Sequence, residues 1–110
     1  MTEETAILLD QIGAMIESPA ATDPTLALED IERTLTDGYA HALSLEAERW
    51  RLERRIGEVA AELTDRNKDV KAEELTTLAR RLSQASGELT RLRGLLVTLR
   101  ERADAIRTPA

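Results

Sequence analysis

Hydrophobic positions in the last third of the chain recur with the spacing of a long, packed helix. From Leu75 to Ile106, apolar residues follow one another at alternating intervals of three and four. This heptad pattern predicts a helix that packs along its whole length against a second helix. The repeating positions are Leu75, Leu78, Leu82, Ala85, Leu89, Leu92, Leu96, Leu99, Ala103 and Ile106.

A second segment, from about Pro24 to about Leu63, carries the same spacing less regularly. Its start is predicted at Asp23-Pro24, because Asp is a preferred helix N-cap and proline fits the first helical position. Glycine and arginine interrupt the apolar series. The repeating positions are Leu28, Ile31, Leu35, Gly38, Ala42, Leu45, Arg49, Leu52, Ile56, Val59 and Leu63.

The two segments are expected to pair as an antiparallel hairpin. A polar, turn-prone stretch at residues 64–70 separates them, and a connection this short makes two helices antiparallel. Centring the turn on Asn67 predicts a register in which small residues meet large ones, with Gly38 opposite Leu96. The facing edges then carry complementary charges, namely Glu32, Glu46 and Glu53 against Arg93, Arg100 and Arg107.

Residues 1–17 predict a short amphipathic helix with Thr2 as its N-cap. A helix of this length is marginal in isolation, so it must dock on another element. Residues 18–23 are small, polar and bounded by proline, and predict a linker to a hairpin that spans residues 24–110. The expected apolar side of the first helix comprises Leu8, Ile12, Met15 and Ile16, with Ile7 and Leu9 adding to it.

Composition favours helices over strands. The chain has 17 leucines, one Trp, one Tyr and no Phe, and 33% of its 110 residues are charged. Few aromatic and β-branched residues beside abundant Ala, Leu, Glu and Arg are typical of coiled coils. We therefore predict an all-α fold: an antiparallel helical hairpin, or coiled coil, with a short N-terminal helix, dimerising into a helical bundle.

One apolar stripe is left over by the predicted hairpin. Tyr39, Leu43 and Trp50 lie on a second face of their helix, and Leu95 and Val97 fall near the same open end. Contiguous apolar patches of this kind usually bind something. The first helix, a second copy of the chain or another protein could cover them, and the residues could also be plain core. The candidate interface is Tyr39, Leu43, Trp50 and Leu95, with Leu8 and Ile12 as its cover or as part of it.

Charge is distributed unevenly and suggests an alternative function. Residues 1–30 hold seven acidic residues and no basic one, whereas residues 75–110 hold seven arginines and three acids. The arginines could contact phosphates if the hairpin formed a nucleic-acid-binding bundle. The net charge of −6 and the lack of aromatic residues for base stacking disfavour that alternative. The arginines are Arg80, Arg81, Arg91, Arg93, Arg100, Arg102 and Arg107.

Residue types needed for chemistry are scarce. There is no Cys, the single histidine is His41, no Glu-x-x-His sequence occurs and every glycine is isolated. His41 is expected to be a packing or solvated residue. We therefore expect no catalytic, metal or cofactor site.

No apolar run approaches the ~18 residues of a membrane span, and the acidic first residues do not resemble a secretory signal. The sequence predicts a cytoplasmic, non-enzymatic scaffold or adaptor that acts through protein–protein association.

Overall fold

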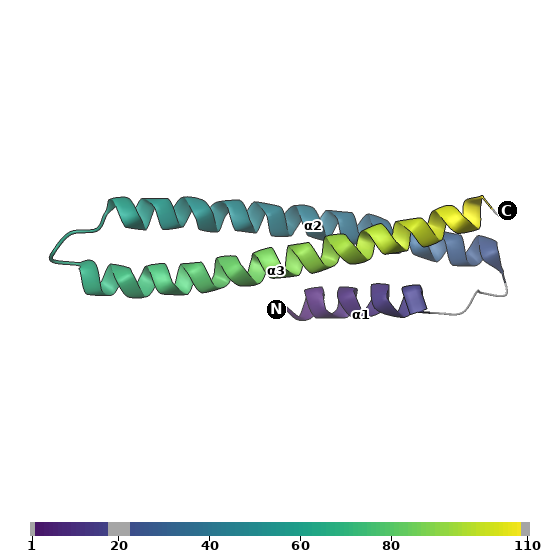
Figure 1. Cartoon of the computed structure of the whole chain (residues 1–110), viewed down its shortest axis with the longest axis horizontal. Coiled ribbons are helices and arrows are strands. Elements are labelled where there is room, and N and C mark those ends of the chain that lie inside the picture. Colours follow the sequence, from purple (N-terminus) through teal and green to yellow (C-terminus); the bar gives the residue numbers. More distant parts are fainter. Residues whose placement is uncertain (1, 18–22, 109–110) are drawn as a thin grey trace.

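The computed structural model describes residues 2–17 and 23–108. It contains α1 (Glu3–Glu17), α2 (Pro24–Ala61) and α3 (Lys68–Arg107), with no strand in the described ranges. Figure 1 shows α2 and α3 running antiparallel as the two arms of a long hairpin. The molecule measures 67 × 19 × 17 Å. The predicted all-α helical hairpin is confirmed. The expected linker, apart from Asp23, lies outside the described residues.

Both predicted N-caps are present. The Asp23 side chain accepts a hydrogen bond from the backbone N–H of Thr25 at 3.0 Å, and Pro24 occupies the first turn of α2. Thr2 Oγ1 accepts a hydrogen bond from the backbone N–H of Thr5 at 3.2 Å at the start of α1. Each cap satisfies one of the backbone donors that a helix start leaves without a partner.

Asn67 organises the turn between α2 and α3. Its side-chain oxygen accepts a hydrogen bond from the Thr64 N–H at 2.7 Å, and its side-chain nitrogen donates to the Glu62 carbonyl at 3.0 Å. Its own carbonyl accepts from the Lys71 N–H at 2.9 Å, in the first turn of α3. Asn67 thus makes hydrogen bonds both to the residues that follow α2 and to the first turn of α3. Helix α3 begins directly after it, at Lys68, which lies inside the range predicted for the turn.

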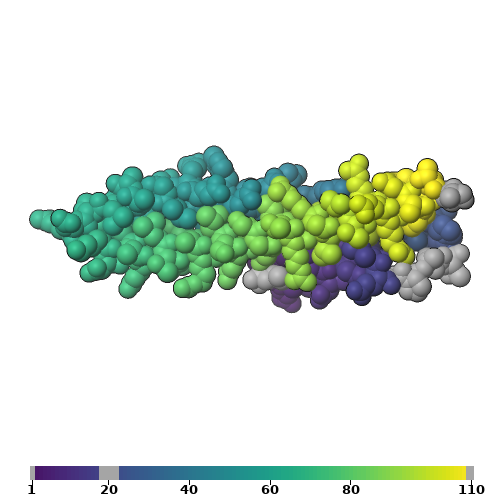
Figure 2. Space-filling model, viewed as in Figure 1, coloured from purple at the N-terminus to yellow at the C-terminus, as the bar shows by residue number. Residues whose placement is uncertain are grey.

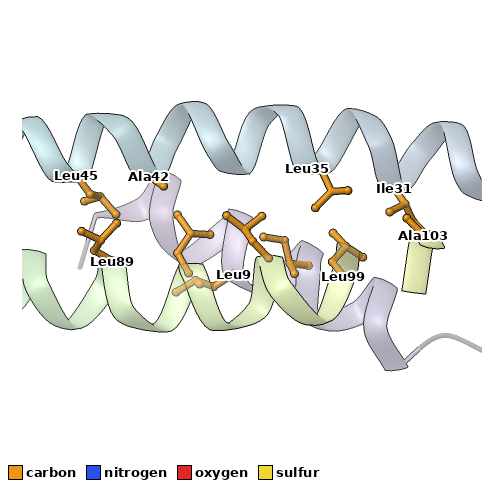
Figure 3. Packing of buried hydrophobic residues seen from close by; sticks show 11 residues of the cluster. Leu9, Ile31, Leu35, Ala42, Leu45, Leu89, Leu99 and Ala103 are labelled. Atoms are coloured by element: carbon orange, nitrogen blue, oxygen red, sulfur yellow. The ribbon is translucent and has the colours of Figure 1, made fainter. Parts of the chain in front are cut away.

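The predicted register between α2 and α3 is also observed. Leu96 packs against Gly38, in the space where a β-carbon of that residue would lie. Other predicted layers face each other in Figure 3: Leu45 with Leu89, Leu35 with Leu99, and Ile31 with Ala103. Most heptad positions of both helices therefore form the core, in which Leu92, Leu99, Ala103 and Val59 are fully buried. Leu63, expected in the seam, is instead exposed, because α2 ends at Ala61.

Ion pairs join the edges of the two long helices. Glu46 pairs with Arg93 and Glu32 pairs with Arg107, as the edge charges predicted. On the other edge, near the turn, Arg55 pairs with Glu74 at 2.8 Å and Lys71 with Glu62 at 2.9 Å. These groups are all partly exposed to solvent, so they select the register more than they stabilise the fold.

Helix α1 covers only half of the rod. It lies beside α3 within the open half and begins near the middle of the rod, so that the turn half is two helices thick (Figures 1 and 2). Leu9 and Ile12 are buried in the shared core, and Leu8, Met15 and Ile16 are partly buried against it. Ile7 is exposed, contrary to its expected place on the apolar side, and Thr5 is buried instead.

Candidate protein-interaction face

Polar contacts define the side of the hairpin on which α1 docks. Thr5 Oγ1 lies 2.7 Å from His41 Nε2, and the Gln11 side-chain amide donates to Thr34 Oγ1 at 3.5 Å. Thr34 and His41 are seven residues apart, and therefore on one face of α2. The lone histidine is thus a packing residue that holds α1, as expected. No feature of the sequence indicated that His41 would pair with the buried Thr5.

Tyr39 points away from α1. At about 100° per residue, it lies roughly 160° around α2 from His41 and roughly 140° from Thr34. The groove beside Tyr39 accordingly has no α1 residue in its lining. Helix α1 therefore does not cover the leftover apolar stripe, which removes one of the occupants considered from the sequence.

The uncovered side carries four large apolar side chains, which we call the open face: Tyr39, Leu43 and Trp50 from α2 and Val97 from α3. Their exposed fractions are 44%, 65%, 59% and 58%, respectively. The interpretation that this stripe belongs to the core of the chain is therefore wrong. Two helices cannot bury residues on the outer flank of their own seam, and the third helix lies elsewhere.

A groove of about 580 Å³ runs between α2 and α3 on the open face. The buried residues Ala42 and Leu96 form its floor, and three residues of the open face, Tyr39, Leu43 and Val97, form its apolar walls. Charged side chains complete the lining: the Glu46–Arg93 pair toward the turn, and Arg100, Glu101 and Asp104 toward the open end. The groove thus combines an apolar centre with a charged rim, the general anatomy of a protein interface.

Trp50 lies beside the groove and not in its lining. It is seven residues from Leu43, hence on the same face and about 10 Å farther along α2. The Arg54 guanidinium is 5.0 Å from the centre of its ring, a cation–π contact that holds one side of the exposed indole. The open face therefore presents a hollow and, two turns away, a projecting aromatic ring.

The remaining predicted interface residues lie on the α1 side. Leu95 packs against the core one heptad before Arg102, whose guanidinium donates to the Ile16 carbonyl of α1 at 3.4 Å. Leu8 is partly buried and Ile12 fully buried on that same side. Val97 takes the place expected for Leu95 in the groove. Their two-residue separation, about 200° around a helix, was the signal that distinguishes them.

The arginines of α3 do not form a free basic stripe. Arg93 pairs with Glu46, and Arg107 pairs with both Glu32 and Asp104. Arg102 binds a carbonyl of α1. Three of the seven candidate phosphate contacts are therefore engaged inside the molecule, which weakens the nucleic-acid alternative.

Over residues 2–17 and 23–108, no group of three or more His, Asp or Glu side chains is arranged to hold a metal ion. No helix there is both long enough and apolar enough to cross a bilayer. Comparison with protein-family models, with curated proteins and with solved structures found no match to this chain.

Proposed function

We propose that the chain is a non-enzymatic helical scaffold that associates with a second copy of itself through the open face. The observation that carries the proposal is the joint exposure of Tyr39, Leu43, Trp50 and Val97 on one face of the hairpin that α1 does not cover. Exposed apolar patches that are rimmed by charge mark interaction surfaces. Burial between two copies would bring four helices together along the shared half, in a bundle.

Self-association explains why the patch persists beside an otherwise well-formed core. The chain already buries the seam of α2 and α3 and the inner side of α1. A two-fold dimer covers one exposed patch with the identical patch, so neither copy of the open face is left uncovered. Catalysis is not part of the proposal, because the only histidine is engaged with Thr5 on the opposite side of α2 from the groove.

Light scattering over a range of protein concentrations, at low and at high salt, tests this proposal. We expect the mass of a dimer that persists at high salt, because apolar burial is not screened by ions. Trp50→Ala should dissociate the dimer and leave helicity by circular dichroism unchanged. The matched control is Val70→Ala, which truncates an even more exposed apolar residue at the turn end of the rod and should leave the mass unchanged.

Two results would contradict the proposal. A monomer at every concentration would show that a second copy does not cover the open face. Lost helicity with unchanged mass in Trp50→Ala would make the indole a folding element and not an interface residue. Association that appears only on addition of duplex or single-stranded nucleic acid, and that weakens steeply with salt, would favour the Arg-rich alternative.

A further inference from the structure

The open face contains both a projecting ring and a hollow that could receive one. Trp50 projects from α2 with 59% of its surface exposed, and the groove opens two helical turns away on the same helix face. A cavity of roughly 150 Å³ accommodates a benzene ring, so a groove of about 580 Å³ has room for an indole and its neighbours. The groove walls are apolar at its centre, where an indole would be buried.

We infer that Trp50 of each copy inserts into the groove of the other copy, between Tyr39 and Leu43 on one wall and Val97 on the opposite wall. This inference rests on the proposed self-association and specifies its geometry. The two-fold axis passes near α2 between Leu43 and Trp50, so that the two α2 helices cross antiparallel. Each contact then occurs twice, and the assembly closes at two copies because no groove is left unfilled.

Charge complementarity supports a second copy as the occupant. Glu53 lies three residues after Trp50, and Arg100 lines the groove. Within the described ranges, neither side chain makes an ion pair, although both were expected at the charged edges of the hairpin. The crossing that inserts Trp50 into the groove carries Glu53 of that copy toward Arg100 of the other. A second copy of the chain can thus provide both Trp50 to fill the groove and Glu53 to pair with Arg100 at its edge.

Complementation between two defective variants tests the reciprocal geometry. Trp50→Ala lacks the ring but keeps the groove, and Val97→Arg blocks the groove but keeps the ring. Each variant alone should be monomeric, since it loses both copies of the contact. Mixed together, they should form a heterodimer that retains one of the two contacts, with the ring of the Val97→Arg chain in the groove of the Trp50→Ala chain.

The single tryptophan provides the readout. The Trp50→Ala chain contains no Trp at all, so all indole emission in the mixture comes from the Val97→Arg chain. Titrating the first into the second should shift the emission to shorter wavelength, saturably, as the ring leaves water. The matched control is the double variant Trp50→Ala/Val97→Arg as titrant, which has no open groove and should cause no shift.

Exchange of the charged partners gives a second test that does not touch the apolar residues. Glu53→Arg and Arg100→Glu should each weaken dimerisation about tenfold or more, because each brings two like charges together. The combined variant should recover most of the loss. Both positions are exposed, so neither change disturbs the core.

The outcomes separate this geometry from the proposed function. A wild-type dimer whose two variants show no complementation, and whose charge reversals are not rescued by each other, would retain the scaffold and overturn the reciprocal insertion. A wild-type monomer would overturn both. Complementation with a saturable emission shift would establish that the groove is the receptor for Trp50.

Discussion

Leu96 of α3 occupies the space in which a β-carbon on Gly38 of α2 would lie. The clash would fall mainly on a terminal methyl of Leu96, whose Cγ would lie 3.4 Å from that carbon. Leu96 is 2% exposed and also forms part of the groove floor, so a β-carbon on Gly38 would push this side chain toward the groove. The two residues form one layer of the hairpin core. Gly38 therefore allows Leu96 to approach the backbone of α2 closely, which offsets the cost of glycine within a helix.

Gly38→Ala should destabilise the protein although it improves helix propensity. The propensity gain is at most about 1 kcal/mol, whereas forcing an extra methyl into a filled core costs about 1–3 kcal/mol. We expect a net loss of about 1 kcal/mol in the free energy of unfolding, measured by urea denaturation followed by circular dichroism.

The control for this change is Gly94→Ala on the outer face of α3. A β-carbon there meets no atom within 4 Å, so only the propensity gain applies. We expect Gly94→Ala to stabilise the protein by up to about 1 kcal/mol. Equal stabilisation by both substitutions would show that Leu96 adapts at no cost and that the layer is loosely packed.

The Glu62–Lys71 ion pair should make the turn end sensitive to pH at both extremes. The hydrogen bond from Lys71, followed by its charge, lowers the pKa of Glu62, and the same hydrogen bond raises the pKa of Lys71. A lowered carboxyl pKa contributes stability above the ordinary glutamate pKa, which is lost as the pH falls through the lowered value. The raised pKa of Lys71 contributes stability below the ordinary lysine pKa, which is lost as the pH rises through the raised value.

Comparing Glu62→Gln with the unsubstituted chain at several pH values tests this linkage. The difference in free energy of unfolding should be present at neutral pH and should disappear in acid, where both chains are uncharged at this position. Glu73→Gln, at an exposed position of α3, serves as the control. A Glu62→Gln difference that is independent of pH would show that the ion pair contributes through packing alone.

Thr5→Val should loosen α1 without unfolding the hairpin. The substitution keeps the shape of a fully buried side chain and removes its hydroxyl contacts with His41 and with Thr2, at a cost of about 1–2 kcal/mol. Hydrogen exchange should therefore quicken in α1 and stay unchanged in the turn half, which α1 does not touch. Thr98→Val, which removes an exposed hydroxyl bonded within α3, should leave α1 protection unchanged. Equal loss of protection in all three helices would mean that α1 and the hairpin unfold as one unit.

The hairpin and its register could be predicted from the sequence because both depend on local periodicity. Heptad spacing selects the buried face of each helix. Centring the turn on Asn67 and matching small with large residues then favours the antiparallel alignment that pairs Gly38 with Leu96. The edge charges agree with that alignment at Glu46 and Arg93. The heptad spacing, the turn and the edge charges all favour the same antiparallel register, and the structure has that register.

The candidate interface could be predicted only in part. Spacing alone placed Tyr39, Leu43 and Trp50 on one stripe, and the structure brings them together with Val97. Leu95 was grouped with this stripe, but it packs on the other flank of α3. Leu95 and Val97 are only two residues apart in the sequence, yet they lie far apart around the helix.

What the sequence by itself determined is therefore the long hairpin, since its seam repeats along each helix and needs no distant contact to be recognised. What only the tertiary structure decided is which flank α1 covers. A short amphipathic helix could satisfy its apolar side on either flank, and the choice depends on non-local contacts, above all the one between buried Thr5 and His41. Because those contacts draw α1 to one flank, the opposite flank keeps Tyr39, Leu43 and Val97 exposed, and Trp50 lies farther toward the turn than α1 extends.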